Sequence, residues 1–341
     1  MRQGDKPENV SRSDSSGSRA RVALIVAGPT CSGKSALALG VAERLPGVVI
    51  NADSMQVYRE LRILTARPTP EEEARVPHRL YGVLPARDVG SVAWWRTEAL
   101  AAMEAAWAEG RTPVLCGGTG MYLRALIEGL AEVPAPTAEA REEARLLALE
   151  PAALHARLLE VDPETGGELR PSDAQRLARA WEVWRSTGRG LAWWRGQPGL
   201  PPAECRFLAV RLHPDRSELR AAIARRFDVM IAAGAVEEVQ RLLSFGLDPA
   251  CPVMRAHGVP ELTAMLRGEF DVTEARDRAV LATGRYTRRQ ATWFNHHALA
   301  SEGDVITIEK RIGDDAQFME RKITSIVSFA KEAIDAAGEQ G

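Results

Sequence analysis

Five short apolar runs are spaced along the chain, at 22–27, 48–53, 113–116, 205–212 and 305–308. Continuous apolar runs of this length, bounded by glycine, proline or polar residues, are typical of strands that are buried on both faces of a sheet. The second run ends in the carboxylate of Asp53, and the third leads into Gly117-Gly118-Thr119-Gly120. Polar groups therefore follow at least two of the predicted strands.

Longer stretches with helical signals alternate with these runs. They cover 35–45, 92–109, 217–233, 236–244, 260–266, 272–297 and the C-terminal residues. Ser91 is a candidate N-cap, and Gly234 is a candidate helix C-cap. Strands that alternate with helices predict an α/β fold with a parallel sheet covered by helices on both faces. In such sheets ligands bind beyond the carboxyl ends of the strands.

The strand pattern is missing between 131 and 203. Helical stretches lie at 152–161 and 174–187, and Thr137 and Ser172 are candidate helix caps. The turn Gln197-Pro198-Gly199 closes the segment. We therefore expect an all-helical insertion at 131–203 in a core made of 21–130 and 204–341. The serine-rich residues 1–20 predict a disordered tail.

A complete phosphate-binding loop separates the first strand from the first helix. It reads Gly28-Pro29-Thr30-Cys31-Ser32-Gly33-Lys34-Ser35. A strand that turns through such a loop into a helix aims backbone N–H groups at condensed phosphates. Lys34 would supply a point charge, and Ser35 would supply a hydroxyl for Mg²⁺. A glycine-rich turn with a solvated lysine has the same letters, but it needs neither the strand before it nor the helix after it.

The loop alone does not identify its ligand, since ATP, GTP or another diphosphate with Mg²⁺ satisfies the same donors. The carboxyl ends of parallel strands meet at one edge of a sheet, so Asp53 and Thr119 are expected near the loop. The sequence therefore predicts a site with a phosphate-binding loop, a carboxylate and a hydroxyl.

The composition is that of a soluble globular protein. Of 341 residues, 45% are hydrophobic and 26% are charged, and the formal net charge is −2. No apolar run has the length of a membrane span, and the first residues lack the apolar segment of a secretory signal. The four cysteines are far apart and form no Cys-x-x-Cys pair, which argues against a zinc site and favours a reducing cytoplasm. We expect a cytoplasmic protein with no membrane partner.

One segment, 278–301, contains no acidic residue. Its basic and aromatic residues are Arg278, Arg285, Tyr286, Arg288, Arg289, Trp293, Phe294, His296 and His297. A basic helix interleaved with aromatic rings can follow a phosphate backbone and stack on bases. A solvated basic face over a packed aromatic stripe has the same composition, and the segment alone favours this second interpretation.

Several motifs in one order resemble those of bacterial tRNA dimethylallyltransferases, from Val22 to about Phe294. The motifs are the loop 28–35, Asp53-Ser54-Met55-Gln56-Val57-Tyr58, Pro77-His78-Arg79-Leu80, Gly117-Gly118-Thr119-Gly120-Met121-Tyr122, Gln175-Arg176-Leu177-Ala178-Arg179-Ala180 and Arg288-Arg289-Gln290-Ala291-Thr292-Trp293. The resemblance implies a phosphate-loop NTPase-like α/β core with an inserted helical domain that binds the anticodon stem-loop of tRNA.

The resemblance also implies a reaction. The dimethylallyl group of dimethylallyl diphosphate would pass to N6 of the adenosine 3′ of the anticodon, with Mg²⁺ and without ATP hydrolysis, although the loop motif alone suggests ATP-binding. Asp53 would be the general base, and Thr119 would donate toward the bridging oxygen of the diphosphate. The diphosphate would be bound by Gly28, Thr30, Ser32, Gly33, Lys34, Ser35 and Arg226, with Ser35 also holding Mg²⁺. We expect the enzyme to be a monomer.

Residues that match tRNA contacts of the family occur in both predicted domains. They are Asp53, Ser54, Met55, Gln56, Thr119, Arg141, Gln175, Arg176, Leu177, Ala178, Arg179, Arg255, Gly258, Arg288, Arg289, Gln290 and Trp293. The arginines would mainly position phosphates, whereas Gln56 and Gln290 can read base edges. Where the family usually has Gly-Tyr-Lys or Gly-Tyr-Arg, this chain has Gly258-Val259-Pro260, which loses an aromatic ring and a cation.

Other functions use the same loop. A small-molecule kinase would share the loop and the sheet, would consume ATP and would need an arginine-rich lid, which 175–179 could imitate. An enzyme that prenylates free adenine nucleotides would not need the helical insertion. A phosphate-loop RNA-binding switch without chemistry would have no use for Asp53 beside the loop. The combined motifs favour the tRNA prenyl transferase.

Overall fold

The structure of the chain, a computed structural model, describes residues 21–313 and 315–338. The predicted disordered tail at 1–20 lies outside the described residues. Within them, two compact units are distinguished: a core unit, 21–122 and 204–338, and a helical unit, 123–203. The first boundary lies at Leu123, earlier in the chain than the predicted 131.

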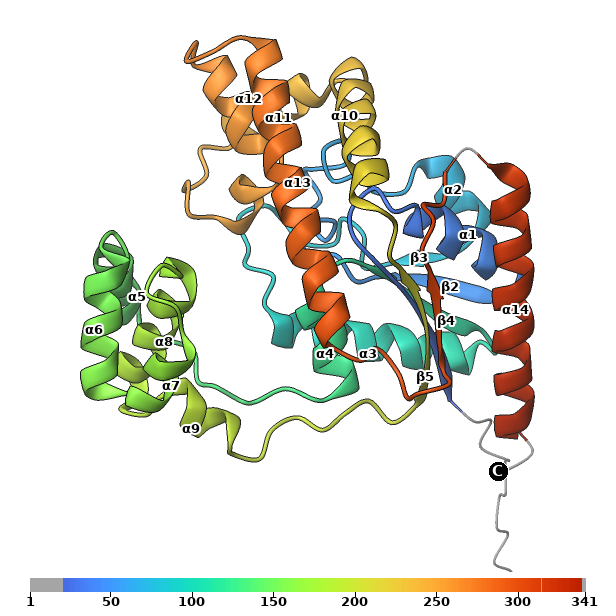
Figure 1. The fold of residues 1–341 in the computed structure, drawn as a ribbon, viewed down its shortest axis with the longest axis horizontal. Coiled ribbons are helices and arrows are strands. Elements are labelled where there is room, and N and C mark those ends of the chain that lie inside the picture. Colours follow the sequence, from blue (N-terminus) through green and yellow to red (C-terminus); the bar gives the residue numbers. More distant parts are fainter. Residues whose placement is uncertain (1–20, 314, 339–341) are drawn as a thin grey trace, which may run out of the picture. The chain divides into compact units, whose positions relative to one another are not determined.

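The core unit contains a six-stranded sheet (Figure 1). Its strands are β1 (Val22–Ala27), β2 (Gly47–Asn51), β3 (His78–Arg79), β4 (Thr112–Gly117), β5 (Arg206–Leu212) and β6 (Val305–Ile308). Their order is β3-β2-β4-β1-β5-β6, and every neighbouring pair runs parallel. The predicted α/β fold is confirmed. The hydrophobic pattern does not predict β3, which has two residues and no apolar run.

Helices connect these strands or follow the last of them. They are α1 (Lys34–Arg44), α2 (Pro70–Arg75), α3 (Val92–Ala108), α10 (Arg216–Ala232), α11 (Ala235–Ser244), the 3-10 helix η1 (Pro252–Arg255), α12 (Val259–Leu266), α13 (Val272–His296) and α14 (Ala316–Gly338), while α4 (Gly120–Ile127) crosses the unit boundary. Ser91 accepts a hydrogen bond from Trp94 N, which confirms the predicted cap of α3. Gly234, with a φ of 100°, follows the C-cap Ala233 of α10 and is itself the N-cap of α11.

The apolar core of this unit packs the sheet against α1 and α14. Leu24 and Val26 of β1 and Ile326 of α14 are fully buried. The two helices approach closely at Gly40, where an added Cβ would lie 2.5 Å from Cδ1 of Ile323. A larger side chain at this position would have to displace the end of the Ile323 side chain, so the glycine favours close packing of the two helices. Figure 1 shows α14 along one side of the sheet.

Besides the end of α4, the helical unit contains helices of 5 to 14 residues. They are α5 (Ala138–Leu147), α6 (Pro151–Val161), α7 (Pro163–Glu168), α8 (Ala174–Thr187) and α9 (Leu191–Arg195). Thr137 caps α5, as predicted, by accepting a hydrogen bond from Ala140 N. The predicted cap Ser172 of α8 is wrong, because Asp173 accepts the hydrogen bond from Arg176 N and Ser172 stands one residue too early. Across both described parts of the chain, no helix is long and apolar enough to cross a membrane.

Candidate functional site

The carboxyl ends of β1, β2 and β4 lie at one edge of the sheet. The register pairs Ala27, the last residue of β1, with Gly117, the last residue of β4, and β2 lies on the other side of β4. A Cβ on Gly117 would lie 2.1 Å from the carbonyl oxygen of Ala52, so the close approach requires glycine. The phosphate-binding loop, Asp53 and Thr119 follow these strands, and they meet at one edge as the sequence predicts.

The phosphate-binding loop, residues 28–35, is held by the segment between β6 and α14. Ile312 N donates to the carbonyl oxygen of Ser32 at 3.0 Å, and Nε of Arg311 donates to that of Cys31 at 3.0 Å. Gly33, the N-cap of α1, has a φ of 91°, and a Cβ there would lie 2.0 Å from the carbonyl oxygen of Ile312. Cys31 also has a positive φ, 66°, which is strained for a residue with a Cβ. The contacts from outside keep the loop in this conformation.

Side chains predicted to bind diphosphate lie on or beside the loop. Nζ of Lys34 is 3.5 Å from the carbonyl oxygen of Pro29, a long contact that a phosphate can replace. Arg226 of α10 reaches the loop, with NH1 3.8 Å from Sγ of Cys31. Oγ of Ser32 is buried and has no hydrogen-bond partner within residues 21–313 and 315–338. Buried hydroxyls normally have a partner, so this loop fits a ligand that brings oxygen atoms.

Asp53 is fixed by a local turn. Its Oδ1 accepts a hydrogen bond from Met55 N at 2.9 Å, and its own N–H donates to Oδ1 of Asn51 at 2.8 Å. The amide nitrogen of Asn51 donates to the carbonyl oxygens of Asp53 and Leu80, both at 3.0 Å. Among the described residues, none donates to Oδ2 of Asp53. The turn therefore aims the carboxylate and leaves one oxygen to accept a proton.

Thr119 is tied to the segment that carries Asp53. Its Oγ1 accepts a hydrogen bond from Ser54 N at 2.9 Å and donates to Oγ of Ser54 at 3.3 Å. Its N–H donates to the carbonyl oxygen of Ala52 at 3.1 Å. The predicted donation from Thr119 to a bridging oxygen would replace the long contact to the Ser54 hydroxyl.

The charge of Asp53 acts on buried and half-buried groups from several elements. Burial raises the pKa of Tyr286 on α13, and the Asp53 carboxylate raises it further. Burial raises the pKa of Cys116 at the end of β4 to about 11, against the opposing charge of Lys34, and Asp53 adds to the rise. Burial lowers the pKa of His257, and Asp53 is among the groups that oppose this change. Asp53 therefore acts on a buried group of β4 and on half-buried groups of α13 and the segment before α12, where electrostatic effects are stronger than in water.

Tyr286 and His257 interact electrostatically with Asp53, and neither is among the individually predicted site residues. Their rings lie 4.8 Å apart, and the guanidinium of Arg289 is 5.5 Å from the Tyr286 ring. Tyr286 stands four residues before Gln290, so the helical period puts both on one face of α13. That spacing is a signal that could have identified Tyr286. His257 has no comparable signal, because only the fold brings it to α13.

α13 has polar side chains with two different environments. Arg288 and Arg289 are exposed and have no ion pair in the described part of the chain. Gln290 is only 4% exposed, and both polar atoms of its amide bond to backbone groups. Trp293 is half-buried and stacks on His297, with ring centroids 4.2 Å apart. The arginines are therefore available to a partner, whereas Gln290 already has partners inside the protein.

Gln56 lies beside a loop that a buried carboxylate holds. Glu238 of α11 is 3% exposed and accepts hydrogen bonds from the backbone N–H groups of residues 62–64 at 2.7 to 2.9 Å. The same loop offers the carbonyl oxygens of Thr65 and Ala66 to Nε2 of Gln56. Because Nε2 of Gln56 is already bonded, the side-chain oxygen Oε1 is the group of Gln56 that can contact a base edge.

The segment around Gly258 accommodates the departure from the family pattern. Arg255 is exposed at the end of η1. Gly258 has a φ of 97° and is the N-cap of α12, and Pro260 stands in the first turn of this helix. Backbone N–H groups in a first turn have no helical partner, so proline removes no needed donor there.

Residues predicted to contact tRNA in the helical unit fall into two classes. Leu177 is fully buried in the core of the unit, and Ala178 is half-buried. The exposed ones are Arg141, Gln175 and Arg176. Arg176 and Arg179 pair with carboxylates three residues away, Asp173 at 3.5 Å and Glu182 at 3.2 Å. Leu177 therefore holds α8 in place, and only its backbone could meet a partner.

Ser35 is the predicted metal ligand. It is exposed in the first turn of α1, next to Lys34. The described residues contain no group of three or more His, Cys, Asp or Glu that could hold a metal ion. Mg²⁺ keeps several waters and takes few protein oxygens when it also binds substrate phosphates. A single hydroxyl beside a phosphate-binding loop is consistent with this coordination preference. The binding of Mg²⁺ stays a prediction.

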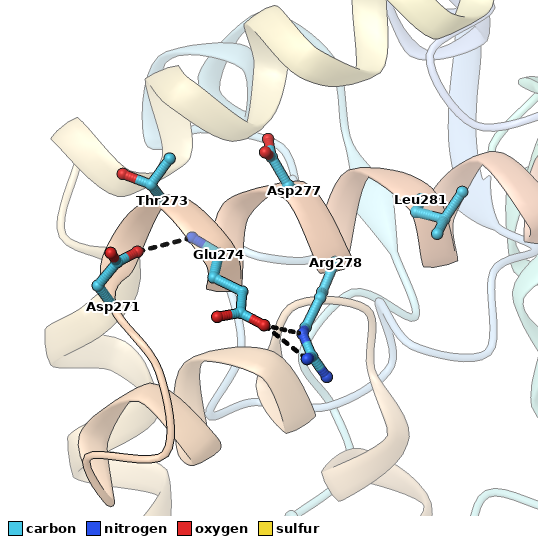
Figure 2. Close-up of a pocket in the computed structure, with 6 residues that line it drawn as sticks. All are labelled: Asp271, Thr273, Glu274, Asp277, Arg278 and Leu281. Atoms are coloured by element: carbon cyan, nitrogen blue, oxygen red, sulfur yellow. Dashed lines mark hydrogen bonds and ion pairs between the residues drawn. The ribbon is translucent and has the colours of Figure 1, made fainter.

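A hollow of about 410 Å³ lies at the start of α13 (Figure 2). It is lined by Asp271, Thr273, Glu274, Asp277, Arg278 and Leu281. Figure 2 shows Glu274 bonded to Arg278, and Asp271 bonded to the backbone N–H of Glu274. An acidic lining whose arginine is already paired would repel a diphosphate. This hollow is therefore not the substrate site.

Comparisons with known proteins identify the family. The profile described as IPP transferase matches residues 56–297, and the profile described as isopentenyl transferase matches residues 20–91. The chain belongs to the IPP transferase family. The tRNA dimethylallyltransferase of Gluconobacter oxydans (strain 621H) is 64% identical over 319 residues, which cover 93% of this chain and 96% of that protein.

Solved structures share the fold. The full-length tRNA isopentenylpyrophosphate transferase of Bacillus halodurans has a TM-score of 0.66 and 29% identity, with 95% of this chain and 99% of that chain covered. A eukaryotic dimethylallyltransferase acting on tRNA has a TM-score of 0.72 at 24% identity, with coverages of 91% and 80%, which shows the fold alone. Membership of the family confirms the resemblance seen in the motifs and disfavours the kinase.

Proposed function

We propose that this member of the IPP transferase family transfers a dimethylallyl group from dimethylallyl diphosphate to N6 of the adenosine 3′ of the anticodon in tRNA. The observation that carries the proposal is the meeting of the phosphate-binding loop, Asp53 and Thr119 at one edge of the sheet. The 64% identity to a tRNA dimethylallyltransferase supports the substrates. We propose a cytoplasmic enzyme that acts as a monomer.

Asp53 acts as the general base. The N6 amine of adenine is a poor nucleophile, because its lone pair is delocalised into the ring. In the reaction the bond from N6 to the allylic carbon forms, the bond from that carbon to the diphosphate oxygen breaks, and N6 loses a proton. The oxygen of Asp53 that has no hydrogen bond among the described residues takes this proton. The Met55 contact holds the carboxylate in one orientation, which limits the entropy lost in reaching the reactive geometry.

Positive groups of the loop stabilise the departing diphosphate. Lys34 and Arg226 lie on or beside the loop, and the N-terminus of α1 points its free N–H groups at the same place. Bound beside Ser35, Mg²⁺ would neutralise part of the same negative charge. Thr119 donates toward the bridging oxygen as the bond to carbon breaks. These groups stabilise the charge that develops in the transition state.

The acceptor is a macromolecule rather than a free nucleotide. An adenine stacked in an anticodon loop cannot reach Asp53, so it must leave the stack. Arg288 and Arg289, exposed two residues and one residue before the buried Gln290, can bind phosphates on either side of the flipped nucleotide. A free adenine nucleotide has no phosphate chain that would need these arginines.

The proposal is tested with two anticodon stem-loops that differ in one base. One carries adenosine 3′ of the anticodon, and the other carries guanosine, which lacks the N6 amine. After incubation with the enzyme, Mg²⁺ and dimethylallyl diphosphate, nucleosides from each RNA are separated and weighed. We expect one dimethylallyl group on that adenosine and none on the guanosine control. Unmodified adenosine, or equal modification of both RNAs, would contradict the proposal.

A further inference from the structure

Gln290 is a buried side chain that connects two glycine-rich turns of the core unit. Its Oε1 accepts a hydrogen bond from Thr30 N in the phosphate-binding loop at 2.9 Å. Its Nε2 donates to the carbonyl oxygen of Gly118, next to Thr119, at 3.0 Å. The oxygen faces a donor and the nitrogen faces an acceptor, so the partners themselves define the orientation of the amide. One side chain thus joins the loop after β1 to the turn after β4.

The space around this amide is closed. A Cβ on Gly118 would lie 2.2 Å from Nε2 of Gln290. The side chain of Gln290 is 4% exposed, so water cannot readily replace either contact. Loss of the amide would leave the Thr30 N–H and the Gly118 carbonyl without their partner. The amide of Gln290 is therefore packed directly against Gly118, and a side chain at residue 118 would displace it.

We propose that Gln290 is a positioning residue that sets the phosphate-binding loop against the Gly118-Thr119 turn, and that it links tRNA docking on α13 to the diphosphate site. The exposed Arg288 and Arg289 precede it directly on the same helix, so a shift of α13 on docking would reach Thr30 through this amide. The inference rests on the proposed function. It replaces the expectation that Gln290 reads a base edge.

Two variants remove the contact in different ways. Gln290→Met keeps the length of the side chain and deletes both hydrogen bonds, whereas Gly118→Ala displaces the unchanged amide. Thr287→Val is the matched control, because Thr287 is 5% exposed on the same helix and its hydroxyl bonds only within that helix, to the carbonyl oxygen of Gly284. The three variants and the unchanged enzyme are compared by thermal unfolding, by KM for dimethylallyl diphosphate, by kcat and by stem-loop Kd.

Both test variants should raise KM for dimethylallyl diphosphate about tenfold, as expected for the loss of a buried hydrogen-bond pair. Their stem-loop Kd should stay unchanged, and the control should leave KM unchanged. A higher stem-loop Kd with an unchanged KM would overturn the proposal in favour of base reading. Equal changes in melting temperature for Gln290→Met and Thr287→Val, with no change of KM, would reduce Gln290 to a packing role.

Hydrogen exchange of the unchanged protein provides a measurement that needs neither folding of a variant nor turnover. The Thr30 amide should exchange slowly without any ligand, and more slowly still when the stem-loop alone is added. Fast exchange of this amide would contradict the positioning role. Failure of the prenylation assay while the Thr30 amide stays protected would instead count against the proposed reaction, so the two failures are distinguishable.

Discussion

In the core unit, the buried side chains of Gln290 and Glu238 bond to segments far away in the sequence, whereas Arg176 and Arg179 in the helical unit pair with carboxylates on or next to their own helix. Gln290 reaches Thr30 and Gly118, and Glu238 reaches the backbone of residues 62–64. Arg176 and Arg179 of α8 pair with carboxylates three residues away, and Arg176 is exposed while Arg179 is half-buried. The edge is built to hold atoms in fixed positions, as catalysis requires, while α8 can rearrange its charges on a partner.

The largest effect is expected at the carboxylate of the edge. Asp53→Asn keeps the size of the side chain but cannot accept a proton, so the single-turnover rate should fall by about two to four orders of magnitude. Binding of both substrates should be largely retained. Asp88→Asn, an exposed carboxylate of the same unit, is the control and should react normally. A near-normal single-turnover rate for Asp53→Asn would remove the general base from the mechanism.

A stability effect should follow from the buried carboxylate of Glu238. In the unchanged protein, three backbone N–H groups donate to the carboxylate of Glu238. Glu238→Gln would place an amide N–H₂ group against some of these donors, and should lower the free energy of unfolding by about 1–3 kcal/mol. Glu237→Gln changes the neighbouring exposed carboxylate and should have little effect. Urea unfolding of the two variants measures the difference. Equal unfolding midpoints would show that the loop at 62–64 does not depend on Glu238.

Arg288 and Arg289 should act through the tRNA backbone. Each phosphate that they neutralise releases counterions, so changing both to alanine should weaken stem-loop binding and flatten its salt dependence by up to about two units of slope. Binding of dimethylallyl diphosphate should not change. Titrations at several salt concentrations measure the slope. An unchanged slope would return these arginines to a solvated face over a packed aromatic stripe.

The salt dependence of stem-loop binding can also be measured for variants of α8, which allows a direct comparison with α13. Arg176 and Arg179 already have carboxylate partners, so the double change to alanine should flatten the slope less, by about one unit or below. A flattening equal to that of the α13 variant would mean that the ion pairs on α8 open fully on binding.

The smallest effect concerns pH. Burial chiefly, and then the charge of Arg289, lower the pKa of His257, against the opposing charges of Glu261 and Asp53. Because the fold favours the neutral form of His257, the unfolded chain binds more protons than the folded chain once the pH falls below about 6.5. The free energy of unfolding should therefore decline as the pH falls through this range. His257→Phe keeps a ring against Tyr286 and should reduce this decline without abolishing it, because burial also lowers the pKa of His78. Urea midpoints above and below that pH provide the check, and an identical decline in the variant would exclude His257 as a cause.

The meeting of the loop and Asp53 could be predicted because it depends on local patterns. Buried runs set the strands, glycine and lysine set the loop, and parallel strands end at one edge. The partners of Gln290 could not be predicted, because Thr30 and Gly118 belong to other strand ends and no spacing in the sequence records the contact. For the same reason a motif match marks Leu177 as a tRNA contact although the fold buries it.

Predictions of short structural features fail for a different reason. Ser172 and Asp173 are both good caps, and only the hydrogen bond to Arg176 N decides between them. β3 is two residues long and pairs only with β2, so its strand geometry comes from the sheet and not from its own residues.

The claim that the loop serves a prenyl diphosphate and not a nucleotide has one direct test. The enzyme, Mg²⁺, dimethylallyl diphosphate and the adenosine stem-loop are incubated with and without ATP, and the RNA mass and ADP are measured together. We predict a gain of one C₅H₈ group without ATP, and no ADP when ATP is present. ADP released in step with RNA modification, or an absolute need for ATP, would contradict it.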